Sequence, residues 1–433
     1  MDPRQREADP LGSTATLEAS EPTIVDVLVV GAGPAGIAAA ITAARHDLEV
    51  LVIDRASFPR DKICGDGLTT AALRELDELG LDPAAVASWI DVDAALVRSP
   101  SGREVLFPFP EREGLYGAVC RRRDLDHALV EHARRLGIRI AEGVAFQSLI
   151  EAEDAVEVIT DGAGTVRARW VIAADGMWSG VRRSLGVAPA QYRGEWHAFR
   201  QYFRDVSPEA ASQLVVWFEP DLLPGYAWSF PLGDGSANVG YGILRGGSYT
   251  VPDMAAVWRD LLRRPHVRDW LGPRAEAEGP HRAWPIPARV DRMTLTHRRT
   301  LFVGDAAAAT DPMTGEGIGQ ALATGRWAAE AIAAAPQPTA DPAEVRRAYE
   351  RAVHRELAVD HRFAERLTAI LRRPLGARGA VRIAGATPWT RRNFARWLFE
   401  DYPRALILTP RRWRRRMFTG PGAYRGRRED TTD

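Results

Sequence analysis

The chain has 433 residues, of which 45% are hydrophobic and 26% are charged, and its formal net charge is zero. This length is sufficient for two or three domains with a sizeable core, and the composition is that of an ordinary globular protein. Because the charges balance, the composition excludes a strongly basic protein that would attract nucleic acid over its whole surface.

The N-terminal segment, residues 1–22, is polar and lacks the apolar region of a secretory signal, so we expect a disordered tail. Cys64 and Cys120 are the only cysteines, which excludes a disulfide scaffold and a cysteine-rich metal site. This cysteine usage suits a reducing compartment. The sequence therefore predicts a cytoplasmic protein without a bound metal.

A glycine-rich turn follows the first apolar run. Residues 27–30 have the length of a parallel strand that is buried on both faces, and Gly31, Gly33 and Gly36 fit the G-x-G-x-x-G fingerprint. The first glycine permits the turn, the second lets a pyrophosphate approach the backbone, and the third lets a helix pack closely on the strand. Asp54 ends the next strand, where an acid can accept hydrogen bonds from a ribose. This pattern predicts a dinucleotide site but does not distinguish NAD from FAD.

The loop after the second strand carries two closely spaced glycines, so its backbone can press against a planar ligand. Thr69 can cap a helix over residues 70–79, which Gly80 would end. Cys64 in this loop has two interpretations: a small packing residue, or a thiol that lies against a cofactor ring.

The middle of the chain predicts short strands over residues 91–117 and a helix that begins near residues 124–126 and ends at Gly137. Further strands follow this helix, and the last of them ends at Asp175 and Gly176. This is the second strand in the chain that ends at an acidic residue.

Residues 191–289 are rich in tryptophan and tyrosine and alternate as strands. Tyr226, Trp228 and Phe230 are two positions apart, so they share one face of a strand and form an aromatic wall. A hairpin turn follows at residues 233–235. The wall is either a face of the core or the lining of an apolar ligand cavity, and the sequence leaves both interpretations open.

A third candidate nucleotide segment begins with a strand that delivers Gly304 and Asp305, an acid that can bind polyol hydroxyls. A loop and a helix from near residue 318 to about residue 335 follow, and the helix N-terminus can hold an anionic group. This segment adds the candidates Pro312, Gly315, Gly317 and Ile318.

From Asp341 the chain is helical and rich in arginine, and residues 404–428 contain nine arginines and no acid. Such a run is either a solvated tail or an interfacial anchor, in which arginines meet lipid phosphates and aromatic side chains enter the acyl boundary. Nucleic acid is a poorer interpretation, because no binding module accompanies the run.

The three nucleotide motifs, in this order, resemble the FAD-dependent para-hydroxybenzoate hydroxylase superfamily over residues 24 to about 335. Two further stretches, residues 58–67 and the Tyr226-x-Trp228-x-Phe230-Pro231 strand, resemble the geranylgeranyl reductase family. Members of that family saturate isoprenoid double bonds. In its overall sequence character, this chain is most similar to the menaquinone side-chain reductases. Ile63 stands where a proline is common in these reductases.

The resemblance implies an α/β fold: a Rossmann-type FAD-binding domain with an inserted antiparallel-sheet substrate domain and a helical C-terminal region. We expect the FAD-binding domain at residues 23–90, 116–186 and 290–340, the substrate domain at residues 91–115 and 187–289, and the helical region with its basic tail at residues 341–433.

The resemblance also implies roles for residues. Gly31, Gly33, Gly36 and Asp54 would hold the AMP end of FAD, and Asp305 the ribityl chain. The other expected cofactor contacts are Arg55, Gly65, Arg122, Asp175, Gly176, Gly304, Pro312, Gly315, Gly317 and Ile318. Tyr226, Trp228 and Phe230 would line the isoprenoid cavity. The sequence identifies no acid as the proton donor, and Cys64, Tyr226 and a water are the candidates.

The implied reaction is the reduction of an isoprenoid C=C bond by hydride transfer from reduced flavin, with NAD(P)H or another reductant as electron donor. An unactivated alkene accepts hydride poorly, so a proton source must lie near it. A monooxygenase of the same superfamily, either an aromatic hydroxylase or an epoxidase, and a non-enzymatic lipid- or flavin-binding protein remain alternatives. The expected partners are an apolar small molecule and a membrane surface, met by the arginine-rich C-terminus, with no nucleic acid.

Overall fold

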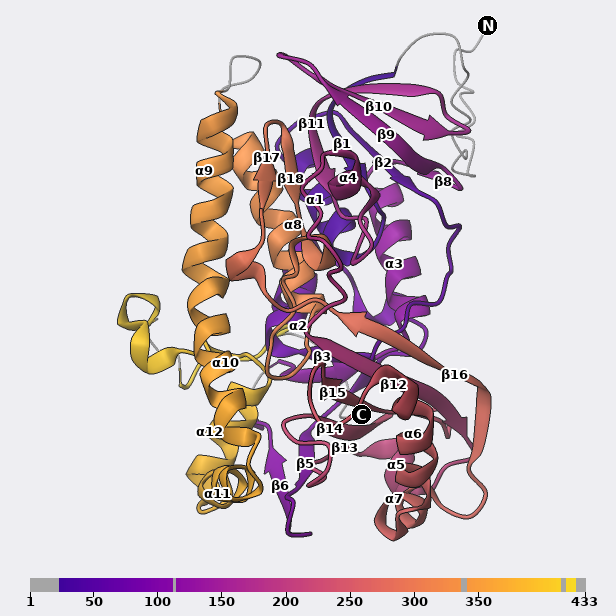
Figure 1. Ribbon diagram of the computed structural model, residues 1–433, viewed down its shortest axis with the longest axis vertical. Coiled ribbons are helices and arrows are strands. Elements are labelled where there is room, and N and C mark those ends of the chain that lie inside the picture. The colour runs from indigo at the N-terminus through magenta and orange to yellow at the C-terminus, as the bar shows by residue number, and fades with distance from the viewer. Residues whose placement is uncertain (1–22, 112–113, 336–340, 414–417, 426–433) are drawn as a thin grey trace, which may run out of the picture.

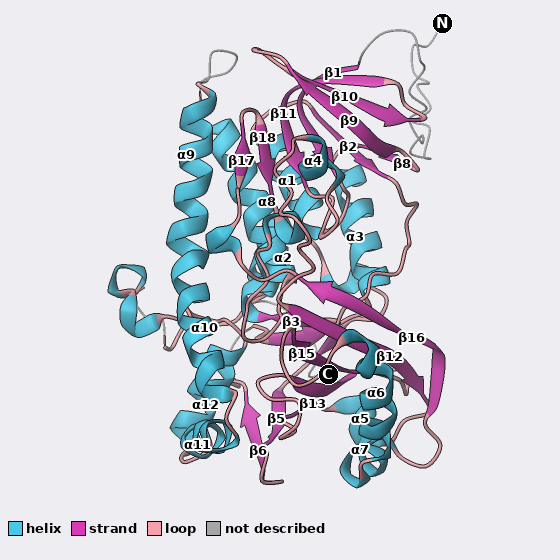
Figure 2. Cartoon of the chain, in the orientation of Figure 1, coloured by secondary structure: helices cyan, strands magenta, loops and turns pink. Residues whose placement is uncertain are grey.

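The computed structural model describes residues 23–111, 114–335, 341–413 and 418–425 (Figure 1). The predicted tail at residues 1–22 lies outside these ranges. Two sheet-centred regions occupy opposite ends of the molecule, and a column of C-terminal helices runs along one side of both (Figure 2). The fold is therefore mixed α/β, with a parallel sheet, a separate antiparallel sheet and a helical C-terminal region.

The first sheet has a parallel core in the order β18-β11-β1-β2-β8. These strands are β1 (Thr23–Val30), β2 (Val50–Asp54), β8 (Arg139–Glu142), β11 (Thr165–Ala173) and β18 (Thr300–Phe302). The antiparallel strands β9 (Ala145–Glu151), β10 (Val156–Asp161) and β17 (Thr296–His297) extend it. Because β1 lies between two neighbours and under helices, residues 27–30 are almost wholly buried, as their apolar run predicts.

The helices of this region begin and end close to where the sequence predicts. The fingerprint turn leads into α1 (Pro34–Ala44), and the third motif leads into α8 (Ile318–Ala333). The side chain of Thr69 accepts a hydrogen bond at the start of α2 (Thr70–Leu79), and Gly80 ends that helix with φ 80°. The helix predicted near residues 124–126 is α3 (Arg122–Arg135), and a short α4 (Gly180–Ser184) follows Asp175.

The second sheet has the order β16-β12-β15-β14-β13-β5-β6 and is antiparallel except for the β13–β5 pair. It combines β5 (Ala94–Arg98) and β6 (Glu104–Pro108) with the later strands β12 (Trp196–Arg204), β13 (Leu214–Trp217), β14 (Tyr226–Pro231), β15 (Ala237–Leu244) and β16 (Glu276–Ile286). The helices α5 (Pro208–Ser212), α6 (Met254–Arg263) and α7 (Pro265–Leu271) lie beside it (Figure 1). A third sheet joins β3 (Gly67–Thr69), β7 (Gly117–Val119) and β4 (Ile90–Asp91).

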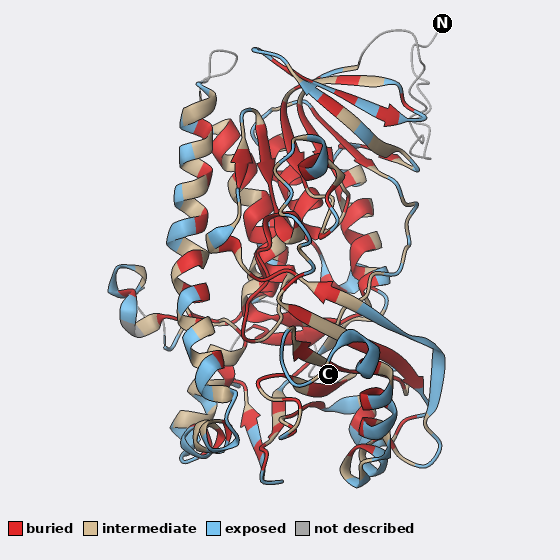
Figure 3. Ribbon diagram, viewed as in Figure 1, coloured by how far each residue is buried: buried red, intermediate tan, exposed pale blue. Residues whose placement is uncertain are grey.

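The C-terminal column consists of α9 (Pro342–Val353), a π-helical turn (His354–Ala358), α10 (Val359–Leu371), α11 (Pro374–Ala384) and α12 (Pro388–Leu398). Figure 3 shows more exposed surface on α10 and α11 than on the helices around the parallel sheet. In the described ranges, no helix combines the length and the apolar character needed to cross a bilayer.

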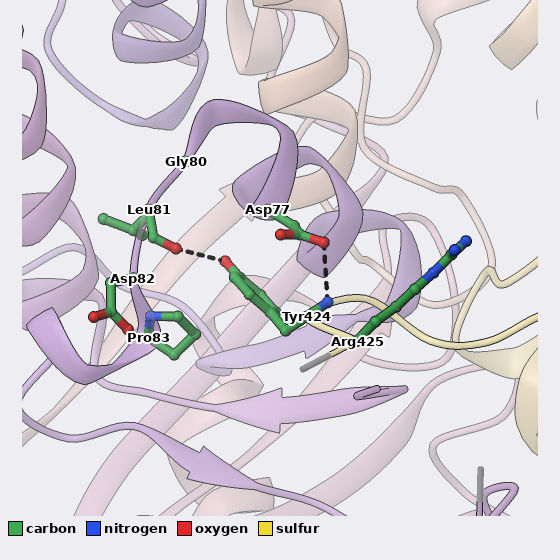
Figure 4. A pocket seen from close by; sticks show the side chains of 7 residues that line it. All are labelled: Asp77, Gly80, Leu81, Asp82, Pro83, Tyr424 and Arg425. Carbon is green, nitrogen blue, oxygen red and sulfur yellow. Dashed lines mark hydrogen bonds between the residues drawn. The ribbon is translucent and has the colours of Figure 1, made fainter. Parts of the chain in front are cut away.

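The arginine-rich segment from residue 404 is not a solvated tail in its described part, which corrects one of the two interpretations given above. Arg404 is buried, and Ala423 pairs with Leu115 in a β-bridge. Figure 4 shows the end of the segment at a surface hollow of about 400 Å³, where the N–H of Tyr424 donates to Asp77 Oδ2 (2.9 Å) and its hydroxyl donates to the carbonyl oxygen of Leu81 (3.0 Å). Aromatic and small residues among the arginines supply this packing.

Candidate functional site

A cavity of about 870 Å³ lies where the parallel sheet, the antiparallel sheet and the C-terminal helices meet. One part of its wall is polar and consists of the turn after β1 and the loops that follow β2, β11 and β18. The other part is apolar and comes from β14, α10, α11 and α12. Clefts of this size at the carboxyl ends of parallel strands hold cofactors and small ligands.

The glycine turn forms a wall against which a pyrophosphate can lie. A Cβ at Gly31 would lie 2.4 Å from the carbonyl oxygen of Ala174, and one at Gly36 would lie 1.8 Å from that of Gly31, so chain packing requires both glycines. A Cβ at Gly33 would meet only the end of the Arg60 side chain, at 3.6 Å. Gly33 lines the cavity, so its missing side chain leaves room for a ligand rather than for the protein, and the turn fits a dinucleotide.

Asp54 ends β2 beside the glycine turn. The N–H of Ala32 donates to its Oδ2 at 2.7 Å, and the N–H of Ala56 donates to its Oδ1 at 2.8 Å. Each carboxylate oxygen keeps a second acceptor position, so a ribose hydroxyl can still bind. The geometry fits the ribose contact that the sequence predicts.

The side chain of Lys62 lies in the polar part of the cavity wall, beside Asp305, the acid that the sequence predicts to bind polyol hydroxyls. Lys62, the only lysine of the chain, has its ammonium 3.7 Å from Asp305 Oδ2 and 4.0 Å from the ring centroid of Trp284. Burial lowers the pKa of Lys62. The resemblance placed Lys62 only at the start of a loop beside the flavin, and the sequence did not predict its contacts with Asp305 and Trp284, because these partners come from distant segments.

A buried carboxylate fixes the loop that carries Cys64. Asp66 adopts φ 69°, and its carboxylate accepts hydrogen bonds from the N–H of Arg122 (3.2 Å), the hydroxyl of Tyr202 (2.8 Å) and the amide of Asn238 (2.7 Å). The same amide donates to the carbonyl oxygen of Cys64 at 2.9 Å. Burial raises the pKa of Asp66. The only sequence signal for this role is an acid between two glycines.

Arg122 is the first residue of α3 and is almost fully buried. Its guanidinium makes two hydrogen bonds of 2.8 Å to Asp126, and Arg60 approaches the same carboxylate at 3.0 Å. This bidentate pair sets the orientation of a guanidinium that lines the cavity.

The aromatic wall and the Cys64 loop, which are far apart in the sequence, form one surface. The ring centroids of Tyr226 and Trp228 are 6.0 Å apart, and those of Trp228 and Phe230 are 6.1 Å apart. A Cβ at Gly65 would lie 3.5 Å from the Phe230 ring, and one at Gly67 would lie 3.2 Å from it. All three aromatic residues line the cavity, and Tyr226 and Phe230 are only partly buried, so the wall faces the cavity as well as the core against which it packs.

A carboxyl group that sequence reasoning did not single out also lines the cavity. Glu316 lies in the loop before α8, and its Oε1 accepts hydrogen bonds from the N–H groups of Ile318 (3.0 Å) and Gly319 (3.2 Å). Burial raises the pKa of Glu316 to about 7. A large fraction of Glu316 therefore carries a proton at neutral pH, as a general acid requires.

A charged cluster lies next to Glu316. The guanidinium of Arg404 lies 3.5 Å from Asp311 and 3.3 Å from Glu400. Thr69 and Gln320 also donate to the Glu400 carboxyl, at 3.2 Å and 2.9 Å, and burial raises its pKa. Negative charge on Asp311 favours the protonated form of Glu316.

The two proton donors suggested by the sequence have different environments. The hydroxyl of Tyr226 donates to the carbonyl oxygen of Thr314, and burial raises the pKa of Tyr226. Burial also raises the pKa of Cys64, which keeps its thiol protonated. The proton of Tyr226 is already engaged by the protein.

Most of the predicted site residues line this one cavity: Gly31, Gly33, Asp54, Arg55, Cys64, Gly65, Arg122, Asp175, Gly176, Tyr226, Trp228, Phe230, Gly304, Asp305, Gly315, Gly317 and Ile318. Gly36 and Pro312 lie outside its lining. Gly36 packs beneath Gly31, and the carbonyl oxygen of Pro312 accepts the indole N–H of Trp196 at 3.0 Å. Two of the predicted cofactor contacts already form hydrogen bonds within the protein. Asp175 accepts a hydrogen bond from the N–H of Val181 at 3.0 Å, and the N–H of Ile318 donates to Glu316.

Comparisons with known proteins agree with this geometry. The family described as FAD binding domain matches residues 24–227. Menaquinone reductase from Mycolicibacterium smegmatis is 35% identical over 334 residues, which cover 71% of this chain and 76% of that protein. Digeranylgeranylglycerophospholipid reductase from Methanosarcina acetivorans is 32% identical over 329 residues, which cover 71% and 75%.

A solved structure shares the fold over nearly the whole chain. A geranylgeranyl bacteriochlorophyll reductase-like protein from Thermoplasma acidophilum superposes with a TM-score of 0.75 and 23% identity, covering 91% of this chain and 100% of that one. This coverage is larger than the residues 24 to about 335 over which the sequence resemblance extends.

Proposed function

The chain belongs to the geranylgeranyl reductase family of FAD-dependent oxidoreductases, and we propose that it saturates a C=C bond in the isoprenoid chain of a lipid. Reduced FAD, when bound, supplies the hydride for such a reaction, and NAD(P)H or another reductant regenerates it. The names of the relatives favour a polyprenyl quinone or a polyprenyl glycerolipid as the substrate class.

The observation that carries this proposal is the single cavity with two unlike ends. Its polar end has the glycine turn and Asp54 of a dinucleotide site, and its apolar end has the aromatic wall of β14 packed against the Cys64 loop. A long apolar chain can lie along this wall beside the cofactor end. The wall lacks the dense polar groups that would orient a phenol, so the arrangement favours a reductase over an aromatic hydroxylase.

The cofactor contacts follow from this arrangement. Gly33 would leave the pyrophosphate room at the backbone, and Asp54 would accept from the ribose. Asp305, with its ion-pair partner Lys62, would bind the ribityl chain. Arg122, whose guanidinium is oriented by Asp126, would add a further polar contact to the cofactor.

Glu316 supplies the proton that the second alkene carbon needs. Its Oε1 accepts two backbone N–H groups, which leaves Oε2 to carry the proton in the neutral acid. Glu316 lines the cavity and has a raised pKa, whereas Tyr226 already donates to the carbonyl oxygen of Thr314.

We keep the domain division expected from the sequence as part of this proposal. Residues 23–90, 116–186 and 290–340 would hold FAD, residues 91–115 and 187–289 would hold the substrate, and residues 341–433 would make up the C-terminal region. Both cysteines are free thiols, which suits the cytoplasm. The arginine-rich C-terminal region touches the membrane in which a polyprenyl lipid resides.

An anaerobic single-turnover assay tests the function. The purified protein is reduced with dithionite and mixed with menaquinone or a geranylgeranyl lipid in detergent. Reoxidation of the flavin with a product that gains two hydrogen atoms supports the reductase. A protein that turns over only with oxygen, to a product that gains an oxygen atom, is a monooxygenase instead. Flavin reduction without any product indicates a binding protein.

A further inference from the structure

Helix α11 exposes apolar side chains on the side that faces away from the cavity. Leu375, Gly379 and Ile383 follow one another at intervals of four, so they form one stripe along the helix. Leu375 is 80% exposed and Ile383 is 73% exposed. Nothing in the described chain covers this stripe, although burying large aliphatic side chains is favourable.

The opposite side of the same helix lines the cavity. Ala377, Ala380 and Val381 of α11 contribute to the cavity wall together with residues of α10 and α12. A helix that is apolar on both sides is normally buried in a protein or lies in a membrane interface. Helix α11 therefore lines this end of the cavity with one side and faces outward with the other.

The charge of this region is entirely positive. Residues 366–399 contain eight arginines and no acidic residue, although the whole chain has zero net charge. Arg372, Arg373, Arg378 and Arg382 are exposed, and none of them forms an ion pair with another described residue. Unpaired arginines beside exposed aliphatic and aromatic side chains fit a surface of anionic lipid headgroups.

Two neighbouring helix ends extend the patch. Ile370, at the end of α10, is 58% exposed, and Trp389, in the first turn of α12, is 65% exposed. Tryptophan favours the boundary between headgroups and acyl chains. We call Ile370, Leu375, Ile383 and Trp389, with the exposed arginines between them, the α11 face.

We infer that the α11 face docks on an anionic bilayer and that the polyprenyl substrate enters the cavity from that bilayer between α10, α11 and α12. The identity of the substrate lipid in this inference rests on the proposed function. The α11 face is a different surface from the arginine-rich segment at residues 404–428. Docking places the apolar end of the cavity one helix away from the acyl region, so an isoprenoid chain passes between these helices without crossing bulk water.

Vesicle co-sedimentation tests the inference. The reagents are vesicles of phosphatidylcholine with phosphatidylglycerol, vesicles of phosphatidylcholine alone, and the variants Leu375→Ser/Ile383→Ser and Arg378→Gln/Arg382→Gln. We expect the first variant to bind about tenfold more weakly or worse to both kinds of vesicle. The second should lose binding only to the anionic vesicles, as high salt would also cause.

The matched control is Ile24→Ser/Ile150→Ser, which removes two apolar side chains of 67% and 61% exposure at the parallel-sheet end of the molecule. It should bind as the parent protein does. Equal binding of the Leu375→Ser/Ile383→Ser variant and the parent would overturn the inference. So would a fall in oligomeric mass for that variant, because the face would then join two copies of the chain.

A second readout separates this inference from the proposed function. Turnover of a short, detergent-soluble polyprenyl substrate should be the same for all these variants, whereas turnover of substrate embedded in vesicles should fall with vesicle binding. If the parent protein binds vesicles through the α11 face but never reduces the soluble substrate, the docking surface stands and the proposed reaction fails.

Discussion

The two ends of the cavity are built by different means. The cofactor end consists of short motifs, each at the carboxyl end of a parallel strand, and much of its surface is backbone. The apolar end is assembled from side chains of β14, α10, α11, α12 and the Cys64 loop, which come from widely separated segments. Cofactor binding at the first end depends on the missing side chain of Gly33. Substrate binding at the second end depends on which side chains the fold brings together around the cavity.

The largest effect should come from the cofactor end. We expect Gly33→Val to abolish FAD binding, because its side chain would occupy the space of the pyrophosphate. Gly33→Ala should fold normally and bind FAD more weakly, since the added Cβ meets only the flexible end of Arg60. Flavin absorbance after gel filtration measures binding, and thermal unfolding of the flavin-free protein measures folding.

Gly36→Ala is the contrasting control. Its Cβ would lie 1.8 Å from the carbonyl oxygen of Gly31, so it should lower the melting temperature of the protein itself. A yellow, FAD-loaded Gly33→Val protein would show that this turn does not hold the pyrophosphate.

The next effect should come from Glu316, in the loop before α8. Glu316→Gln keeps an oxygen for the N–H groups of Ile318 and Gly319 but removes the transferable proton. We expect turnover to fall by about 100-fold, the lower range for loss of a general acid, while FAD stays bound. With a pKa of about 7, the parent enzyme should be active below that pH and lose turnover as the pH rises through it. The variant should lack this limb of the pH profile.

Glu365→Gln serves as the matched control. Burial also raises the pKa of Glu365, but this residue of α10 pairs with Arg292 and does not line the cavity. Its variant should keep both the rate and the pH profile. An unchanged pH profile in Glu316→Gln would assign the proton to another group.

The difference between the two ends also explains what the sequence could predict. The fingerprint turn, the cap at Thr69, the stop at Gly80 and the aromatic face of β14 depend on spacing within a few residues, and the structure has them where the spacing indicates. The resemblance to FAD-dependent reductases rested on the same short motifs, and the relatives confirm it.

The rest depends on contacts between distant segments. Asp66 owes its role to Tyr202 and Asn238, and Lys62 owes its role to Asp305. Glu316 acquires its raised pKa from burial beneath elements that the sequence does not bring together. The segment from residue 404 was interpreted from its charge, but Arg404 is buried between Asp311 and Glu400. The amino-acid composition of a segment indicates how it could behave in isolation. It does not show which acidic side chains from other segments pair with its arginines in the folded protein.

The smallest effect sharpens the assignment at the apolar end. Tyr226→Phe keeps the ring in the aromatic wall and removes the hydroxyl that donates to the carbonyl oxygen of Thr314. Leaving that carbonyl without its donor should cost about 1 kcal/mol of stability. Turnover should fall by less than about tenfold, well short of the loss of a general acid, because Tyr226 shapes the wall and does not donate to the substrate.

Cys64→Ser should behave similarly, since a hydroxyl of similar size still fits beside the loop carbonyl held by Asn238. Anaerobic single-turnover rates of both variants beside Glu316→Gln decide the matter. A loss in Tyr226→Phe as large as that in Glu316→Gln would mean that the two groups form one proton path, and the wall would then take part in the chemistry as well as in binding.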